Sequence, residues 1–225
     1  MPRKHNPSSL NLPNILTVSR LFMTVLFVWL FTLEGMISSW IALGVFGLAS
    51  LTDWLDGYLA RKLNQQTAFG IFMDPLADKI LVLSALLIFL WENLVSVWLV
   101  IIIVARESVI TSIRMLAEGR GVSLGAMPSG KQKLVSQIVA IIGILIILCI
   151  QRTISAQTGQ PWDTVLERLG GGYALTAGIM RRLPNILLFI AMIFSVISGV
   201  IFIRKHRDLF INFGSSSSGK SGAPR

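Results

Sequence analysis

Four aspartates at short, regular spacings are the residues of this sequence best suited to chemistry. Asp53 and Asp56 lie three positions apart, and Asp74 and Asp78 lie four apart. On a helix, either spacing puts both carboxylates on one face. Each pair falls in or beside an apolar run, where a carboxylate is costly and by default marks a functional site. Pairing with nearby basic residues, or helix capping, is the weaker reading for four residues so arranged.

A divalent cation is the simplest reason for these carboxylates to gather. A tight turn between the two apolar runs would let all four converge, which like charges do only around something positive. We expect one or two ions bound by Asp53, Asp56, Asp74 and Asp78. Mg²⁺ suits such a site because it uses few protein carboxylates and completes its shell with water and substrate phosphate. Mn²⁺ is the open alternative.

Small and basic residues between the aspartates extend the candidate site. Gly57 lies one turn beyond Asp53, and Gly70 lies one turn before Asp74. A glycine there lets a ligand or a neighbouring helix approach the backbone, although packing alone also explains it. Arg61 follows one turn after Gly57, where its guanidinium could bind a phosphate with two hydrogen bonds.

The elements that must position these residues are membrane-spanning helices. The chain has 225 residues, of which 53% are hydrophobic and 14% charged, too apolar a mixture for a soluble domain of this size. Crossing the hydrocarbon takes about 20 apolar residues, and only helices satisfy the backbone of such segments. Six segments qualify: Ile15–Leu33, Met36–Ala60, Ala68–Trp91, Val95–Ala117, Leu134–Gln151 and Leu183–Ile203.

Charge placement predicts the orientation. The net charge of +9 is concentrated in short segments between alternate apolar runs, so both termini are expected in the cytoplasm. The basic loop from Arg152 to Arg182 falls on the opposite side, but long loops follow this rule less strictly. The first run has no small-residue cleavage site and is expected to remain as an anchor. No basic stripe with interleaved aromatics is present, so no nucleic-acid partner is expected.

The domain organisation follows from the same pattern. Residues 1–213 are expected to form one membrane domain, without internal repeats. Residues 214–225 are rich in glycine and serine and are expected to be a disordered tail.

The stretch that carries the aspartates resembles a known family signature. It reads D-x-x-D-G-x-x-A-R-x8-G-x3-D-x3-D from Asp53 to Asp78, which is similar to the signature of the CDP-alcohol phosphatidyltransferase family. The resemblance implies an all-α fold of six transmembrane helices with a cytosol-facing polar cavity. It also implies that the four aspartates ligate the metal and that Asp78 acts as the base. The residues implied to bind CDP-diacylglycerol are Asn14, Thr17, Gly57, Ala60, Arg61 and Gly70.

A narrower resemblance is to the bacterial phosphatidylglycerophosphate synthases and extends from Asn11 to about Gln137. It rests on the segments Asn11–Arg20, Phe69–Lys79, Ala105–Glu107, Arg114 and Gly130–Lys133. It implies sn-glycerol 3-phosphate as the acceptor, attachment to the cytoplasmic membrane and, by family analogy, a homodimer.

Depth in the membrane independently favours a phosphorylated acceptor. At about 1.5 Å per residue, Asp78 lies roughly 16 Å into its helix, and Arg106 lies at a similar depth in the next helix. A buried arginine there is paired or faces a phosphate. Arg106, Arg114, Lys131 and Lys133 are therefore candidates for binding the acceptor's phosphate. Pairing of Arg106 with Glu107 or an aspartate is the alternative, and for the lysines it is ordinary cytoplasmic charge.

Other functions stay open at this point. Within the family, the acceptor could be phosphatidylglycerol, as in a cardiolipin synthase, or inositol phosphate; serine fits the basic residues less well. A cation transporter would use the aspartates as an ion site. That reading leaves the positions of Gly57, Arg61 and Gly70 unexplained.

Overall fold

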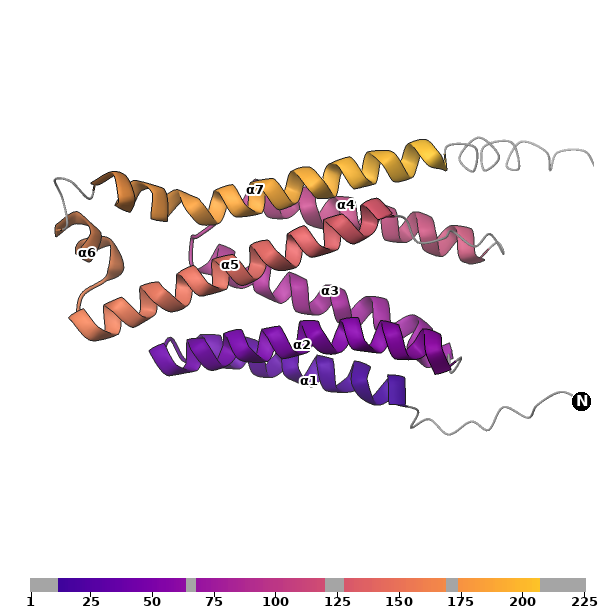
Figure 1. Cartoon of the computed structure of the whole chain (residues 1–225). Coiled ribbons are helices and arrows are strands. Elements are labelled where there is room, and N and C mark those ends of the chain that lie inside the picture. The colour runs from indigo at the N-terminus through magenta and orange to yellow at the C-terminus, as the bar shows by residue number, and fades with distance from the viewer. Residues whose placement is uncertain (1–11, 64–67, 120–127, 169–173, 207–225) are drawn as a thin grey trace, which may run out of the picture. The chain divides into compact units, whose positions relative to one another are not determined.

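The computed structural model describes residues 12–63, 68–119, 128–168 and 174–206, and these residues are helical apart from short connections. Six long helices correspond to the six predicted segments (Figure 1), although α1 ends at Thr32 and α4 begins at Val97, and a short helix, α6, lies in the long loop. The glycines at 170–172 and the tail fall outside the described residues. The helices are α1 (Leu12–Thr32), α2 (Met36–Leu63), α3 (Ala68–Trp91), α4 (Val97–Gly119), α5 (Pro128–Thr158), α6 (Trp162–Arg168) and α7 (Ala174–Lys205).

Helices α5 and α7 are longer than the apolar segments that predicted them. Hydrogen bonding along a helix does not depend on the polarity of its side chains, so both continue into polar sequence at their ends. The portions Gln132–Thr158 and Gly178–Lys205 are long and apolar enough to cross a membrane. Shorter apolar stretches occur in α1, α2 and α3.

Packing divides the chain into two compact units. The first unit comprises Met1–Ser96 and Ile138–Leu187, and the second comprises Val97–Gln137 and Leu188–Arg225. In the first unit, α1 packs against both α2 and α3. Phe27 of α1 packs on Phe46 of α2, with its ring centroid 5.3 Å from the ring centroids of Phe46 and of Phe31 on its own helix.

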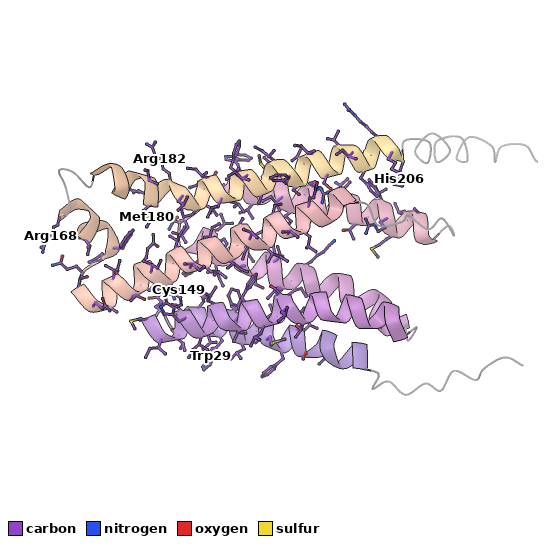
Figure 2. All side chains as sticks on the ribbon, in the orientation of Figure 1. Trp29, Cys149, Arg168, Met180, Arg182 and His206 are labelled. Atoms are coloured by element: carbon purple, nitrogen blue, oxygen red, sulfur yellow. The ribbon has the colours of Figure 1, made fainter. Side chains whose placement is uncertain are left out.

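The outward face of α1 is apolar, unlike that of a water-soluble helix. Phe22 is 70% exposed and Val25 is 68% exposed, and Trp29 also points outward (Figure 2). Arg20 and Thr24, by contrast, are buried. Phe27, Leu30 and Phe31 are buried as well, so the inner face is mixed, but the apolar outer face suits a lipid surrounding.

Two tight turns fix the connections that precede α2 and α4. At the start of α2, the Ser38 hydroxyl accepts a hydrogen bond from the amide of Gly35, which is half of a capping box. At the end of α3, Asn93 adopts a positive φ of 54°. The amide of Leu94 donates to the carbonyl of Phe89 and that of Asn93 to the carbonyl of Leu90, the pattern of a Schellman motif.

In the second unit, α4 and the last part of α7 pack with parallel directions. Arg106 of α4 lies against Gly199 of α7. Further along both helices, Ile110 and Ala117 form a buried cluster with Phe202. Residues later in α4 therefore contact residues later in α7, as expected for helices that run in the same direction.

Candidate active site

The backbone carries the family-like motif on two helices, as the spacing predicted. Helix α2 continues through Asp53 and Asp56, and α3 begins before Asp74 and continues through Asp78. The three- and four-residue spacings therefore do fall on helical backbone. The side chains of these aspartates lie outside the described residues, as do those of Asn14, Thr17, Gly57, Ala60, Arg61, Gly70 and Lys131. Their roles and the metal site stay predictions.

Arg20 of α1 is a buried charged residue that was assigned no role from its type and spacing. It is only 1% exposed, and its backbone carbonyl accepts a hydrogen bond from the Thr24 hydroxyl at 2.8 Å. It belongs to the helix that packs on both α2 and α3, the two helices that hold the aspartates. A buried guanidinium in an apolar helix is paired with an acidic group or with backbone carbonyls, or it marks a functional site. The sequence hint of a role for Arg20 was its place in Asn11–Arg20, one of the segments on which the narrower resemblance rests.

Arg106 is half-buried in α4 and crosses α7 at Gly199. A Cβ atom built on Gly199 would lie 3.0 Å from Arg106 Nε and 3.4 Å from its Cγ. Nε is buried, and no hydrogen-bond acceptor for it occurs among the described residues. The stem of Arg106 is thus fixed by packing against glycine, which leaves the cationic end to interact elsewhere.

Glu107 pairs with Lys133 rather than with its neighbour Arg106. The Lys133 ammonium donates to Glu107 Oε1 at 2.5 Å, linking α4 to the start of α5. The described contacts thus include no ion pair between Arg106 and Glu107, and pairing of Arg106 with an aspartate lies outside the described side chains. A lysine and a glutamate 26 positions apart share no local spacing, so their contact depends on tertiary packing.

Two buried polar side chains of the second unit have no described partner. Gln137 follows Lys133 by one turn of α5 and is 2% exposed, and Ser195 precedes Gly199 by one turn of α7 and is 1% exposed. Among the described residues, neither amide atom of Gln137 nor Oγ of Ser195 has a hydrogen-bond partner. Buried polar atoms are normally satisfied. A bound group or water can serve these atoms at each position.

Arg114 and His206 flank the ring of Phe202 near the ends of α4 and α7. The Arg114 guanidinium carbon lies 5.8 Å from the ring centroid, and the His206 ring lies 4.6 Å from it. His206, labelled at the end of α7 in Figure 2, also contacts the Phe202 carbonyl through Nδ1 at 3.0 Å. Arg114 is exposed, so this cation–π contact leaves its charge accessible to an anion.

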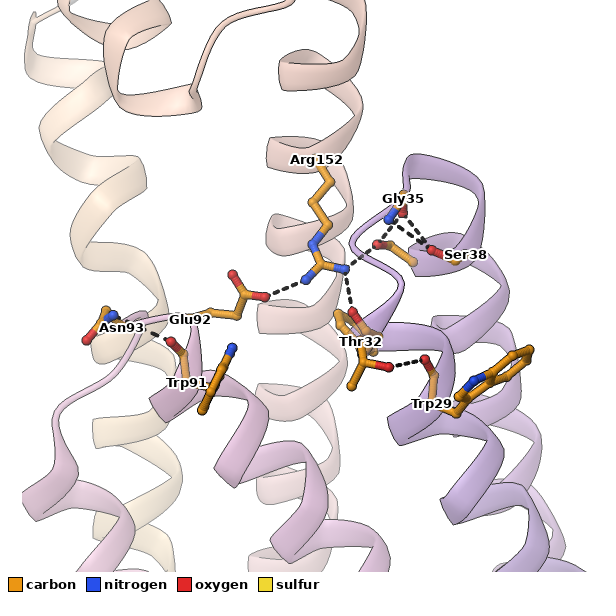
Figure 3. Close-up of polar contacts among 10 residues, drawn as sticks. Trp29, Thr32, Gly35, Ser38, Trp91, Glu92, Asn93 and Arg152 are labelled. Carbon is orange, nitrogen blue, oxygen red and sulfur yellow. Dashed lines mark hydrogen bonds and ion pairs between the residues drawn. The ribbon is translucent and has the colours of Figure 1, made fainter.

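Arg152 accounts for part of the basic loop that the charge pattern left unexplained. Its guanidinium donates to the Phe31 carbonyl at 3.1 Å and to the Ser39 hydroxyl at 2.9 Å, and it forms an ion pair with Glu92 (Figure 3). It also lies over the Phe31 ring, 5.0 Å from the centroid. Arg152 thus ties the ends of α1 and α3 to the start of α2, and it is structural rather than part of the site.

Comparison with known proteins defines the class. The family model for CDP-alcohol phosphatidyltransferases matches residues 10–197. The chain therefore belongs to the CDP-alcohol phosphatidyltransferase family, and it is an enzyme of that family. The match extends well beyond the aspartate motif, into α7.

Individual relatives share a more particular name. The chain is 47% identical over 102 residues to the CDP-diacylglycerol–glycerol-3-phosphate 3-phosphatidyltransferase of Bacillus subtilis, covering 45% of this chain and 53% of the relative. It is 39% identical over 142 residues to the protein of that name from Pseudomonas fluorescens, covering 60% and 72%. The Escherichia coli K12 protein of that name is 38% identical over 140 residues, covering 60% and 76%.

Proposed function

We propose that this enzyme transfers the phosphatidyl group from CDP-diacylglycerol to sn-glycerol 3-phosphate, giving phosphatidylglycerol phosphate and CMP. The main support for glycerol 3-phosphate as the acceptor is a group of basic residues on α4 and α5. Arg106 is fixed at mid-helix, Lys133 lies beside Glu107, and Arg114 is exposed beyond them. An acceptor with a phosphomonoester suits this set, and the names of the relatives agree with it.

The reaction is a direct displacement at phosphorus. The free hydroxyl of glycerol 3-phosphate attacks the phosphorus attached to diacylglycerol, forming a new P–O bond as the pyrophosphate bond breaks and CMP leaves. Asp78 accepts the hydroxyl proton. Arg61, with the close approach at Gly57, seats the CDP portion, while the phosphate of the acceptor binds Arg106 and the basic residues nearer the cytosol.

A divalent cation fits the donor set on α2 and α3. Mg²⁺ or Mn²⁺ prefers carboxylate oxygens, and Asp53, Asp56, Asp74 and Asp78 would hold it. When bound, it would neutralise charge on the pyrophosphate and the leaving CMP.

Six membrane crossings are the topology that we propose. Arg152 joins the C-terminal ends of α1 and α3 to the start of α2 from near the end of α5. Asn185 of α7 bonds both the Leu94 carbonyl and the Ser96 amide in the connection before α4. The C-terminal ends of α1, α3 and α5 therefore lie with the N-terminal parts of α2 and α7 and the connection before α4. Helices that cross a membrane in alternating directions require this arrangement.

The proposed enzyme lies in the membrane with its site on the cytoplasmic side and forms a homodimer. The exposed Trp29, Trp40 and Trp91 lie near the helix ends that Arg152 joins, which suits a membrane interface. The positive charge of alternate loops supports an orientation with both termini and the site on the cytoplasmic side of the cytoplasmic membrane. Residues 1–213 act as one domain, and a homodimer is expected by family analogy.

Measurement of CMP release by purified protein tests this function. The protein is given CDP-diacylglycerol and Mg²⁺ with glycerol 3-phosphate, inositol phosphate, serine or phosphatidylglycerol in parallel. Release with glycerol 3-phosphate alone, abolished by EDTA and restored by Mg²⁺ or Mn²⁺, is the expected result. Release with phosphatidylglycerol would instead indicate a cardiolipin synthase. No release with any acceptor from folded protein would favour a cation transporter.

A further inference from the structure

The position of Gly199 distinguishes it from the other described glycines. An added Cβ would meet Arg106 at Nε (3.0 Å), Cγ (3.4 Å) and Cδ (3.8 Å), so the arginine stem passes directly over the α7 backbone. At Gly44, Gly47, Gly130 and Gly178, an added Cβ would meet nothing within 4 Å. At Gly143, it would meet a leucine. Among the described residues, only Gly199 makes room for a charged side chain.

The surroundings of Gly199 are small and polar at this level of α7. Ser195, one turn earlier, and Ser198, the preceding residue, are both buried. One turn later, the helix presents the bulky Phe202 to α4. The small residues of α7 thus lie where the Arg106 side chain packs, and they leave the space that this side chain occupies.

We propose that Gly199 is a positioning residue for the acceptor: by lacking a side chain, it sets where the Arg106 guanidinium meets the acceptor's phosphate. This inference rests on the proposed function. Atoms Cγ, Cδ and Nε are the atoms nearest to Gly199. The stem is therefore held there, and the two terminal nitrogens remain for a phosphate. Two-point recognition of a phosphate depends on the orientation of the planar guanidinium.

A side chain at position 199 should weaken binding of the acceptor more than binding of CDP-diacylglycerol. A methyl group would displace the Arg106 stem by a few tenths of an ångström. A misplacement of about 1 Å costs roughly 10²-fold, so we expect Gly199→Ala to raise the KM for glycerol 3-phosphate by roughly three- to tenfold. Gly199→Val should raise it further. The KM for CDP-diacylglycerol should change by less than about twofold, since Arg106 is not assigned to that substrate.

The test measures CMP release by the purified full-length protein, varying each substrate separately. Gly178→Ala is the matched control, because it adds the same methyl to the same helix in open space. A selective rise in the KM for glycerol 3-phosphate in Gly199→Ala, absent in Gly178→Ala, supports the inference. An unchanged KM, or an equal rise for both substrates, overturns it while leaving the function intact. Wild-type protein without turnover overturns the function itself, and the inference with it.

A double-mutant cycle on thermal unfolding tests the same contact without activity. If the added methyl acts through Arg106, Gly199→Ala lowers the melting temperature of the wild type but not that of Arg106→Ala, which lacks the contacting atoms. Equal losses in both backgrounds would show that the methyl acts elsewhere. This measurement decides the matter even if Gly199→Ala is too unstable to assay.

Discussion

Lys133 of α5 and Glu107 of α4 form an ion pair with 2.5 Å between the ammonium nitrogen and the carboxylate oxygen. Their side chains are only 13% and 17% exposed, so the pair is largely shielded from water. Breaking such a pair leaves an uncompensated charge and is more damaging than losing an exposed one. The pair joins the residue next to Arg106 to the basic start of α5.

A charge swap separates the structural and functional roles of this pair. Glu107→Gln should lower the melting temperature and raise the KM for glycerol 3-phosphate, because Lys133 loses its fixed position. The double variant Glu107→Lys with Lys133→Glu should recover much of the stability but not the KM, since the ammonium then projects from the wrong helix. Recovery of both would show that Lys133 has no part in acceptor binding. Glu34→Gln, in the exposed turn before α2, is the control.

Asp78→Asn should abolish turnover while the protein stays folded. The substitution preserves the shape of the side chain but removes its capacity to accept a proton, and it weakens the carboxylate set. CMP release should fall by at least about 10²-fold, the lower end for loss of a general base. A melting temperature close to that of the wild type would exclude unfolding as the cause. Activity like that of the wild type would remove Asp78 as the base.

Arg152→Gln should destabilise the protein with little effect on either KM. The change removes the ion pair to Glu92 and hydrogen bonds to the Phe31 carbonyl and the Ser39 hydroxyl. Loss of a largely buried charged partner costs about 3 kcal/mol. Thermal unfolding in detergent measures the loss, with the exposed Arg182→Gln as control. A large change in KM without a change in melting temperature would contradict the structural role.

Gln137→Met should make the protein more stable. The substitution keeps the length of the side chain but removes two buried polar atoms without described partners. An unsatisfied buried group costs about 1–3 kcal/mol, so the melting temperature should rise. If the amide serves the bound acceptor, the KM for glycerol 3-phosphate should rise as well. A lower melting temperature would mean that the amide is already satisfied within the protein.

The sequence predicted the helices well because apolar length and helical structure are linked in lipid. The bounds Ala68–Trp91 agree with α3, and Met36 begins α2 as expected. The partner of Glu107 and the contacts of Arg152 could not be predicted, because both depend on side chains brought together by helices far apart in the sequence. Gly199 carried no signal either: one glycine in an apolar run acquires meaning only from the arginine beside it.

The candidate site is predicted more fully than it is described. The aspartate motif identified the family correctly, and the match to residues 10–197 agrees with it. The backbone of α2 and α3 carries the motif at the expected positions. The ligand set, the base and the choice of metal depend on carboxylate positions outside the described side chains, and they stay predictions.

The uneven polarity of the helices has a consequence for biogenesis. Helices α5 and α7 contain stretches apolar enough to partition into the bilayer by themselves. Helices α2 and α3 instead carry the aspartates within their length, and a carboxylate strongly disfavours insertion of an isolated helix. We therefore expect α1 to anchor the nascent chain, while α2 and α3 insert stably only after later helices have been synthesised and can pack against them. A chain truncated after α3 should then stay membrane-bound through α1 but leave cysteines introduced into α3 open to a water-soluble thiol reagent, whereas the same cysteines in the longer chain should be protected.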